Sequence, residues 1–209
     1  MRYIQSEKEE LFNVITHGLG VLLSIVGIIL LIINYDANLI NLSYVIIYGL
    51  SLILLFSAST IYHYVSEQKY KRALRKLDHI SIYVLIAGTY TPICMSVLKD
   101  TRGLLLLILV WSITAIGLIL KLFFTGKFEK VSLLLYLVMG WLIVLDFQNL
   151  YEAITDLTLN YLILGGAFYT GGIVFYVLHQ LKYHHVIWHV FVLLGALFHY
   201  LMIWNIITV

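Results

Sequence analysis

The sequence predicts an all-α integral membrane protein, a bundle of seven transmembrane helices with its N-terminus in the cytoplasm and its C-terminus outside. Three observations lead to this fold class. Hydrophobic residues make up 62% of the 209 residues and charged residues 11%, and the mean hydropathy is +0.97. A soluble domain is only roughly half apolar. Long apolar runs recur along the chain, and Lys and Arg gather on one side of them.

The spans follow from the length of the apolar runs, because a helix needs about 20 such residues to cross the hydrocarbon core. We expect seven spans, at about 12–33, 42–64, 79–98, 103–123, 131–150, 159–179 and 186–206. Acidic residues precede the long first run, which therefore does not resemble a cleaved signal peptide. The fifth run is short because Asp146 ends it. Short loops and the lack of an internal repeat predict a single domain over residues 1–209.

Orientation follows from the distribution of basic residues. Eleven of the 13 Lys and Arg residues lie on one side of these spans and two on the other. The first group is Arg2, Lys8, Lys69, Lys71, Arg72, Arg75, Lys76, Lys121, Lys127, Lys130 and Lys182, and the second is Lys99 and Arg102. The positive-inside rule therefore places the N-terminus in the cytoplasm. The net charge of +2 gives no indication of a nucleic-acid partner, and the single Cys94 can form no internal disulfide.

Ionisable and polar side chains are expected at one depth, just under the cytoplasmic surface. Span 1 contributes Asn13 and His17, span 2 His63, span 3 Asp78 and His79, and span 7 His185 and His189. The middle and outer thirds of the bundle are nearly free of charge. His199 is the deep exception among the ionisable residues; its position on the helix is within about 40° of that of His185, so both lie on one face. The glycines at 165, 166, 171 and 172 are expected to allow close helix packing, or to leave a gap for lipid beside the sixth span.

Within this layer the spacing of two histidines predicts a metal site. His185 and His189 are four residues apart and share one helix face, whereas His184 is rotated by about 100° and is expected to point elsewhere. A catalytic zinc typically takes three protein ligands and leaves one position for water. We expect the third ligand to be His63, which lies at the same depth with Ser59 one turn before it.

Asp78 is the candidate general base, because the residue after His185 is a valine and not the glutamate of an H-E-x-x-H protease. Asp78 could instead cap the helix that follows it. The single histidines at positions 17, 79, 179 and 184 are typical of interfacial or hydrogen-bonded residues. Three imidazoles also suit iron, manganese and other first-row metals, so the residues themselves leave the metal open.

Four motifs in this order resemble one known family. They are E-x-x-N-x-x-T-H (Glu10, Asn13, Thr16, His17), S-x-x-x-H (Ser59, His63), L-D-H with a following G-T-Y-T-P (Leu77 to His79, Gly88 to Pro92), and H-x-x-x-H (His185, His189). Together they are similar to the hemolysin III group, the bacterial branch of the progestin and adipoQ receptor family. The resemblance implies seven helices, a zinc ion on His63, His185 and His189, a water linked to Asp78 with Ser59 nearby, and a place in the bacterial cell membrane.

The resemblance leaves three functions open. Related alkaline ceramidases suggest a zinc-dependent hydrolase of a ceramide-like lipid amide, in which Asp78 would accept a proton and Ser59 would help to stabilise the oxyanion. A regulator or sensor of membrane lipids, with zinc only tying helices together, is the alternative. A pore-forming hemolysin is the third, although a pore needs polar groups along its full length. The sequence predicts membrane lipids as partners and does not predict the oligomeric state.

Overall fold

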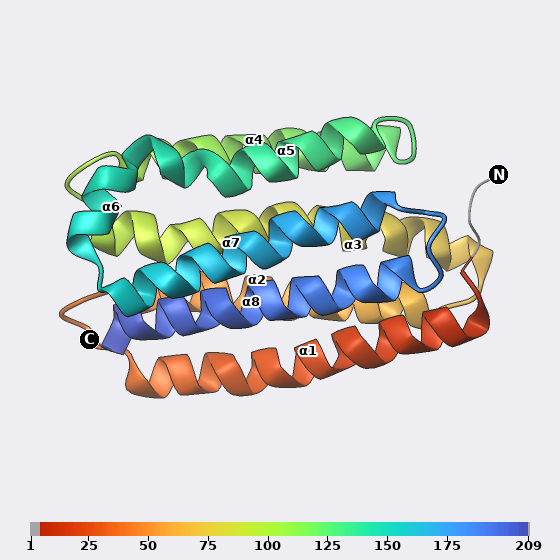
Figure 1. The fold of residues 1–209 in the computed structure, drawn as a ribbon, viewed down its shortest axis with the longest axis horizontal. Helices are drawn as coiled ribbons and strands as arrows, with labels where there is room; N and C mark the ends of the chain where they lie inside the picture. Colours follow the sequence, from red (N-terminus) through yellow and green to blue (C-terminus); the bar gives the residue numbers. More distant parts are fainter. Residues whose placement is uncertain (1–4, 209) are drawn as a thin grey trace.

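The computed structural model describes residues 5–208, and within them it contains seven helical stretches long and apolar enough to cross a membrane. The predicted seven-helix bundle is thus confirmed (Figure 1). The stretches are Glu7–Asn34 (α1), Leu42–Tyr64 (α2), Gln68–Val97 (α3, Gln68–Pro92, then a π-helical turn), Gly103–Phe124 (α4), Glu129–Ala153 (α5, Glu129–Trp141, then a 3-10 turn and α6, Phe147–Ala153), Asp156–Val177 (α7) and His184–Thr208 (α8). Arg2 lies outside the described residues.

Helix α1 shows how the bundle hides polar groups and exposes apolar ones. Its start is a capping box, in which the Ser6 hydroxyl accepts from the Glu9 backbone and the Glu9 carboxylate accepts from the Ser6 backbone. The buried face then runs through polar or small residues, namely Glu9, Asn13, His17, Gly20, Ser24 and Gly27, before Leu31. The leucines and isoleucines between them face outward, where lipid would cover them. This stripe carries the first motif onto the interior of the bundle.

The third span differs from the sequence expectation at its start. We expected it to begin at residue 79, whereas α3 begins at Gln68 and takes in the basic segment before the apolar run. Lys71 and Arg75 lie on the inner side of this extension, because each binds a carboxylate on another helix: Lys71 binds Glu10 of α1 and Arg75 binds Glu129 of α5. The apolar count missed these turns because many of their residues are charged and they lie before the apolar run.

Helix α1 contacts α2 and α8, α2 contacts α3, α3 contacts α4, and α7 contacts α8. Spans that follow one another in the chain run antiparallel, whereas α1 and α8 run in the same direction (Figure 1). Helices α4 and α5 lie side by side along one edge of the bundle (Figure 1). Close approach of α7 and α8 depends on two glycines. A Cβ on Gly165 would lie 2.1 Å from the His199 ring, and a Cβ on Gly172 would lie 2.8 Å from Phe191. Gly166, by contrast, has nothing within 4 Å.

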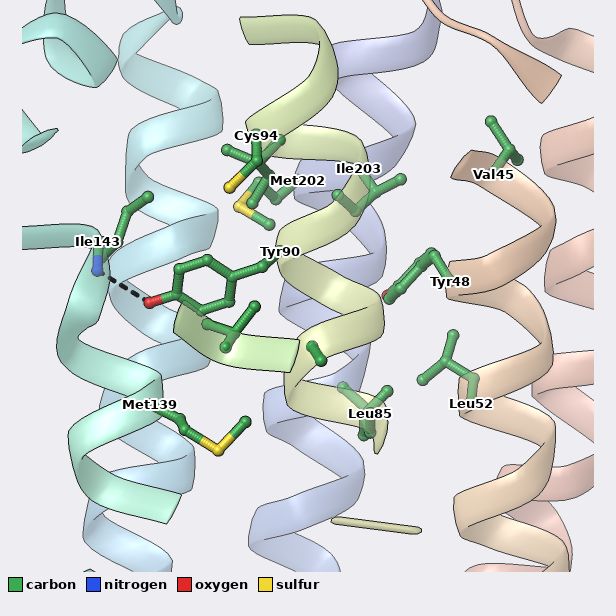
Figure 2. Packing of buried hydrophobic residues seen from close by; sticks show 14 of the residues in the cluster. Val45, Tyr48, Leu52, Leu85, Tyr90, Cys94, Met139, Ile143, Met202 and Ile203 are labelled. Atoms are coloured by element: carbon green, nitrogen blue, oxygen red, sulfur yellow. Dashed lines mark hydrogen bonds between the residues drawn. The ribbon is translucent and has the colours of Figure 1, made fainter. Parts of the chain in front are cut away.

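Irregular turns in the fifth span are held by side chains of neighbouring helices. The Tyr90 hydroxyl of α3 accepts a hydrogen bond from the Ile143 backbone at 2.8 Å (Figure 2). The same hydroxyl donates to the Gly140 carbonyl at 3.2 Å. Asp146 ends the 3-10 turn and accepts from the Thr101 hydroxyl at 2.6 Å and the Arg102 backbone at 2.9 Å. Within a membrane such polar backbone groups need partners inside the protein.

Candidate metal centre

The structure brings the three predicted ligands together. His63 lies in the last turn of α2, and His185 and His189 lie in the first turns of α8. One ring nitrogen from each of these histidines lies within 4.8 Å of the others, and no other group of this kind occurs among residues 5–208. The end of the bundle that carries this centre also carries the start of α1, which we predict to be cytoplasmic. Three imidazoles at this separation could hold one metal ion.

The two ring nitrogens of His63 are in different environments. Nδ1 lies 2.5 Å from the Glu10 Oε2 carboxylate oxygen, whereas Nε2 is buried and has no hydrogen-bond partner within the described part of the chain. If Nδ1 donates its proton to Glu10, Nε2 presents a lone pair toward His185 and His189. A carboxylate that fixes the tautomer in this way is the usual outer partner of a metal-binding histidine. The residues therefore fit a metal ion.

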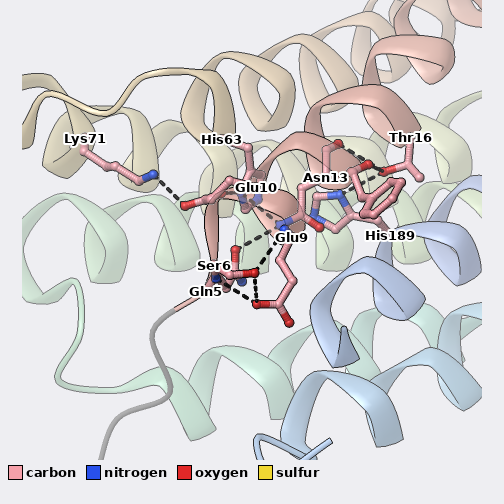
Figure 3. Close-up of polar contacts among 10 residues, drawn as sticks. Gln5, Ser6, Glu9, Glu10, Asn13, Thr16, His63, Lys71 and His189 are labelled. Atoms are coloured by element: carbon pink, nitrogen blue, oxygen red, sulfur yellow. Dashed lines mark hydrogen bonds and ion pairs between the residues drawn. The ribbon is translucent and has the colours of Figure 1, made fainter. Parts of the chain in front are cut away.

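Glu10 also connects the centre to the basic start of α3. Its second oxygen, Oε1, accepts from Lys71 Nζ at 2.7 Å, so one carboxylate joins His63 to a cation (Figure 3). Asn13, one turn further along α1, lies 3.3 Å from His63 Nδ1 and donates to Gln5 at 2.9 Å. Sequence reasoning placed Glu10 in a motif but gave it no role. Its spacing to Asn13 and His17 on one helix face was the available signal.

His17 and Thr16 contact the second ligand of the α8 pair. The His17 ring stacks on that of His189, with centroids 3.6 Å apart and an interplanar angle of 13°, and meets Phe56 edge-on. Thr16 Oγ1 lies 3.5 Å from His189 Nδ1. His17 is only 3% exposed, yet neither of its nitrogens has a hydrogen-bond partner among residues 5–208. His17 therefore lies in the interior of the bundle and not at its surface, and it is not a member of the three-histidine group.

Ser59 and Asp78 lie on α2 and α3 and line the same cavity as the histidines. Ser59 is buried, and its hydroxyl lies within hydrogen-bonding reach of the half-buried Asp78 carboxylate. The alternative role of Asp78 as a helix cap is wrong, since α3 begins ten residues earlier with Glu67 at its N-cap position. Asp78 instead occupies an interior turn of the helix, facing the centre.

The remaining histidines lie outside the three-histidine group. His184 Nδ1 lies 3.1 Å from the Phe175 carbonyl of α7, in agreement with the expected rotation away from the group. His79 Nδ1 lies 3.6 Å from Glu129, which is also bound by Lys121. His199 lies deep in α8, with Nε2 3.4 Å from the Leu162 carbonyl.

A cavity of about 510 Å³ extends from the metal centre into the bundle. His17, Ser59, Asp78, His185 and His189 line one end, and most of the remaining wall is apolar, from α3, α5, α7 and α8. The cavity reaches the outer surface between α5 and α7. Its lining includes Trp141 and Val144 from the fifth span and Ile163 from α7, which are 57%, 55% and 54% exposed.

Comparisons with known proteins show which proteins the chain is similar to. The family model described as "Haemolysin-III related" matches residues 5–200. The chain is 44% identical over 192 residues to the hemolysin-3 homolog of Bacillus subtilis, covering 90% of each protein. It is 41% identical over 197 residues to hemolysin-3 of Bacillus cereus, covering 93% of this chain and 90% of that protein. It is 33% identical over 170 residues to the human monocyte to macrophage differentiation factor, covering 76% of this chain and 68% of that protein.

Proposed function

The chain belongs to the haemolysin-III-related family, and on this basis we propose that it is a zinc-dependent hydrolase of a membrane lipid amide. One observation carries the proposal: three convergent imidazoles and a carboxylate lie at the polar end of a large, mostly apolar cavity that reaches the lipid-facing surface. A ceramide-like substrate has the matching shape, with a polar amide near the membrane interface and long hydrocarbon chains beyond it.

Zinc is proposed because of the donor set. Three neutral imidazoles with an open fourth position are typical of catalytic zinc, whereas structural zinc almost always has four protein ligands. His63, His185 and His189 would hold the ion, and Glu10 would orient His63. When bound, zinc would supply a Lewis acid that activates a water molecule and polarises the substrate carbonyl.

Asp78 would act as the general base. It would accept the proton that the water loses as the water oxygen bonds to the amide carbon. It would then return this proton to the leaving nitrogen as the carbon–nitrogen bond breaks, so that a fatty acid and an amine are released. Ser59, within hydrogen-bonding reach of Asp78, would hold the carboxylate in position.

The substrate would enter sideways from the bilayer. The exposed rim residues Trp141, Val144 and Ile163 lie between α5 and α7, and for the part of the chain that the structure describes no close packing joins these two helices. A lipid could thus move its hydrocarbon chains into the cavity without leaving the membrane. With the N-terminus in the cytoplasm, the reaction would take place at the inner leaflet of the cell membrane.

Two other functions are less well supported. A pore needs polar groups along its whole length, but the wall of this cavity is mostly apolar beyond the metal end. The name of the Bacillus cereus relative, hemolysin-3, describes lysis by that protein. A lipid sensor with structural zinc would need a fourth protein ligand, and the ligand group among residues 5–208 has three members.

The test is release of fatty acid from a ceramide by the zinc-loaded protein in detergent. We expect turnover by the wild type and a fall of about 10²-fold or more in Asp78→Asn, since general bases contribute typically 10²–10⁴-fold. Asp100→Asn is the matched control, because Asp100 is exposed at the opposite end of the bundle. Zinc-loaded wild type that hydrolyses none of a panel of ceramides and other lipid amides would contradict the proposal and favour a sensor.

A further inference from the structure

We propose that His17 is a substrate-binding catalytic residue that donates a hydrogen bond to the acyl carbonyl oxygen of the lipid. The inference rests on the proposed function, because it assigns a further residue to the same site. It gives a role to a side chain that the motif contains but that the three-ligand centre does not use.

The first support is the unsatisfied state of the imidazole. A neutral imidazole carries one donor and one acceptor, and burial of such groups without partners is costly. His17 is 3% exposed, and neither ring nitrogen makes a hydrogen bond of good geometry in the part of the chain that the structure describes; a backbone group of His189 lies near the ring. A polar group of a bound molecule would satisfy them. A leucine or phenylalanine would suit an interior position that only needed filling.

The second support is the position of the ring. His17 lines the cavity together with His185 and His189. Its stack on His189, at 3.6 Å and 13°, covers one flat face, and its perpendicular contact with Phe56 helps to fix the plane of the ring. The ring is thus held on the cavity wall beside the metal centre, where its edge nitrogens, which are buried in the unliganded protein, would meet a polar group of a bound lipid.

The third support is that several neighbouring donors are already engaged. The Ser59 hydroxyl lies within hydrogen-bonding reach of Asp78, and the Tyr136 hydroxyl donates to the His79 carbonyl at 2.8 Å. Thr16 donates to backbone carbonyls of its own helix. The sequence suggested Ser59 as the group that would stabilise the oxyanion. The contacts of Ser59 favour a positioning role for it, and the stack of His17 on His189 favours His17 as the donor next to the metal centre.

This role gives His17 a specific effect on the reaction. As the water oxygen bonds to the amide carbon, negative charge grows on the carbonyl oxygen. A hydrogen bond from a fixed donor becomes stronger as that charge develops. The same donor would bind a carboxylate oxygen of the released fatty acid, so the contact can be measured in a binding experiment as well as in turnover.

The test compares two replacements at position 17 that separate hydrogen bonding from stacking. His17→Phe keeps an aromatic ring against His189 but has no donor, whereas His17→Gln keeps a donor but loses the stack. The measurements are zinc per chain, the affinity of the zinc-loaded protein for palmitate, and kcat and KM for a ceramide. The thermal stability of the wild type and of both variants is measured as well, so that a misfolded variant is recognised.

We expect both variants to keep about one zinc per chain. His17→Phe should lose about 10²-fold or more in kcat and bind palmitate about 3- to 10-fold more weakly, while His17→Gln should recover most of both. Wild-type kcat and palmitate affinity in His17→Phe would overturn the inference. It would also be overturned if His17→Gln lost zinc while His17→Phe kept it, because His17 would then act only by stacking on His189. If the zinc-loaded wild type hydrolyses no lipid amide, the proposed function fails, and the palmitate affinities still decide whether His17 binds the acyl group.

Discussion

Replacing Glu10 tests whether the centre depends on residues beyond its three ligands. The Glu10 carboxylate accepts from His63 Nδ1 at 2.5 Å, and the His63 side chain is 1% exposed. In Glu10→Ala this buried N–H would lose its charged acceptor, and the ring could rotate or change tautomer. In Glu10→Gln an amide oxygen could still accept, but the negative charge would be lost.

The expected magnitude follows from the position of Glu10 next to a ligand. Loss of an outer partner of a metal-binding histidine typically lowers metal affinity by 10–100-fold, which is about 1.4–2.7 kcal/mol. We place Glu10→Ala near the upper limit and Glu10→Gln near the lower one. Lys71→Met should change the affinity by less than about 3-fold, because the Lys71–Glu10 ion pair is partly exposed and such pairs contribute little.

The assay is a competition titration of the detergent-purified protein with a zinc chelator of known affinity. Glu7→Gln is the matched control, since Glu7 lies one turn before Glu10 and is exposed. Its zinc affinity should equal that of the wild type. If Glu10→Ala also binds zinc as tightly as the wild type, His63 does not need its carboxylate partner and the reasoning is wrong.

Three further predictions concern the bundle and the cavity. Gly165→Ala should destabilise the fold by about 1–3 kcal/mol in denaturant unfolding, because the new methyl group would collide with His199; Gly166→Ala, which meets open space, should cost less than about 1 kcal/mol. A larger side chain in Gly166→Phe would enter the cavity, so palmitate binding should weaken at least 10-fold while zinc is retained; unchanged binding would mean that lipid does not occupy this space. Asp146→Ala should cost about 1–3 kcal/mol, because Asp146 accepts hydrogen bonds from Thr101 and the Arg102 backbone, whereas the exposed Asp100→Ala should be neutral in the same measurement.

The fold could be predicted largely because the bilayer restricts the choices. Seven apolar runs leave only helices as spanning elements, and the structure contains seven such helices within residues 5–208. The early start of α3 could not be read from hydropathy. The added turns are rich in charged residues, among them Lys71 and Arg75, which contact carboxylates 61 and 54 residues away, and the hydropathy of a segment does not contain such pairings.

The group of three histidines was predictable for a similar reason. Spacing put His185 and His189 on one face, and matched depth selected His63, so local geometry sufficed. The partners of these residues were harder to predict. The Glu10 contact to His63 and the stack of His17 on His189 depend on how α1 packs against α2 and α8. The cavity, with its opening between α5 and α7, likewise arises from the arrangement of whole helices.

The measurement that tests the central claim most directly is the metal content of the detergent-purified protein, by elemental analysis, beside His63→Ala and His185→Ala. His184→Ala is the matched control, because His184 is the neighbour of a ligand and lies outside the group. We predict about one zinc per chain in the wild type and in His184→Ala, and none in the other two variants. Well-folded wild type without metal, or zinc that persists in both His63→Ala and His185→Ala, would contradict the account.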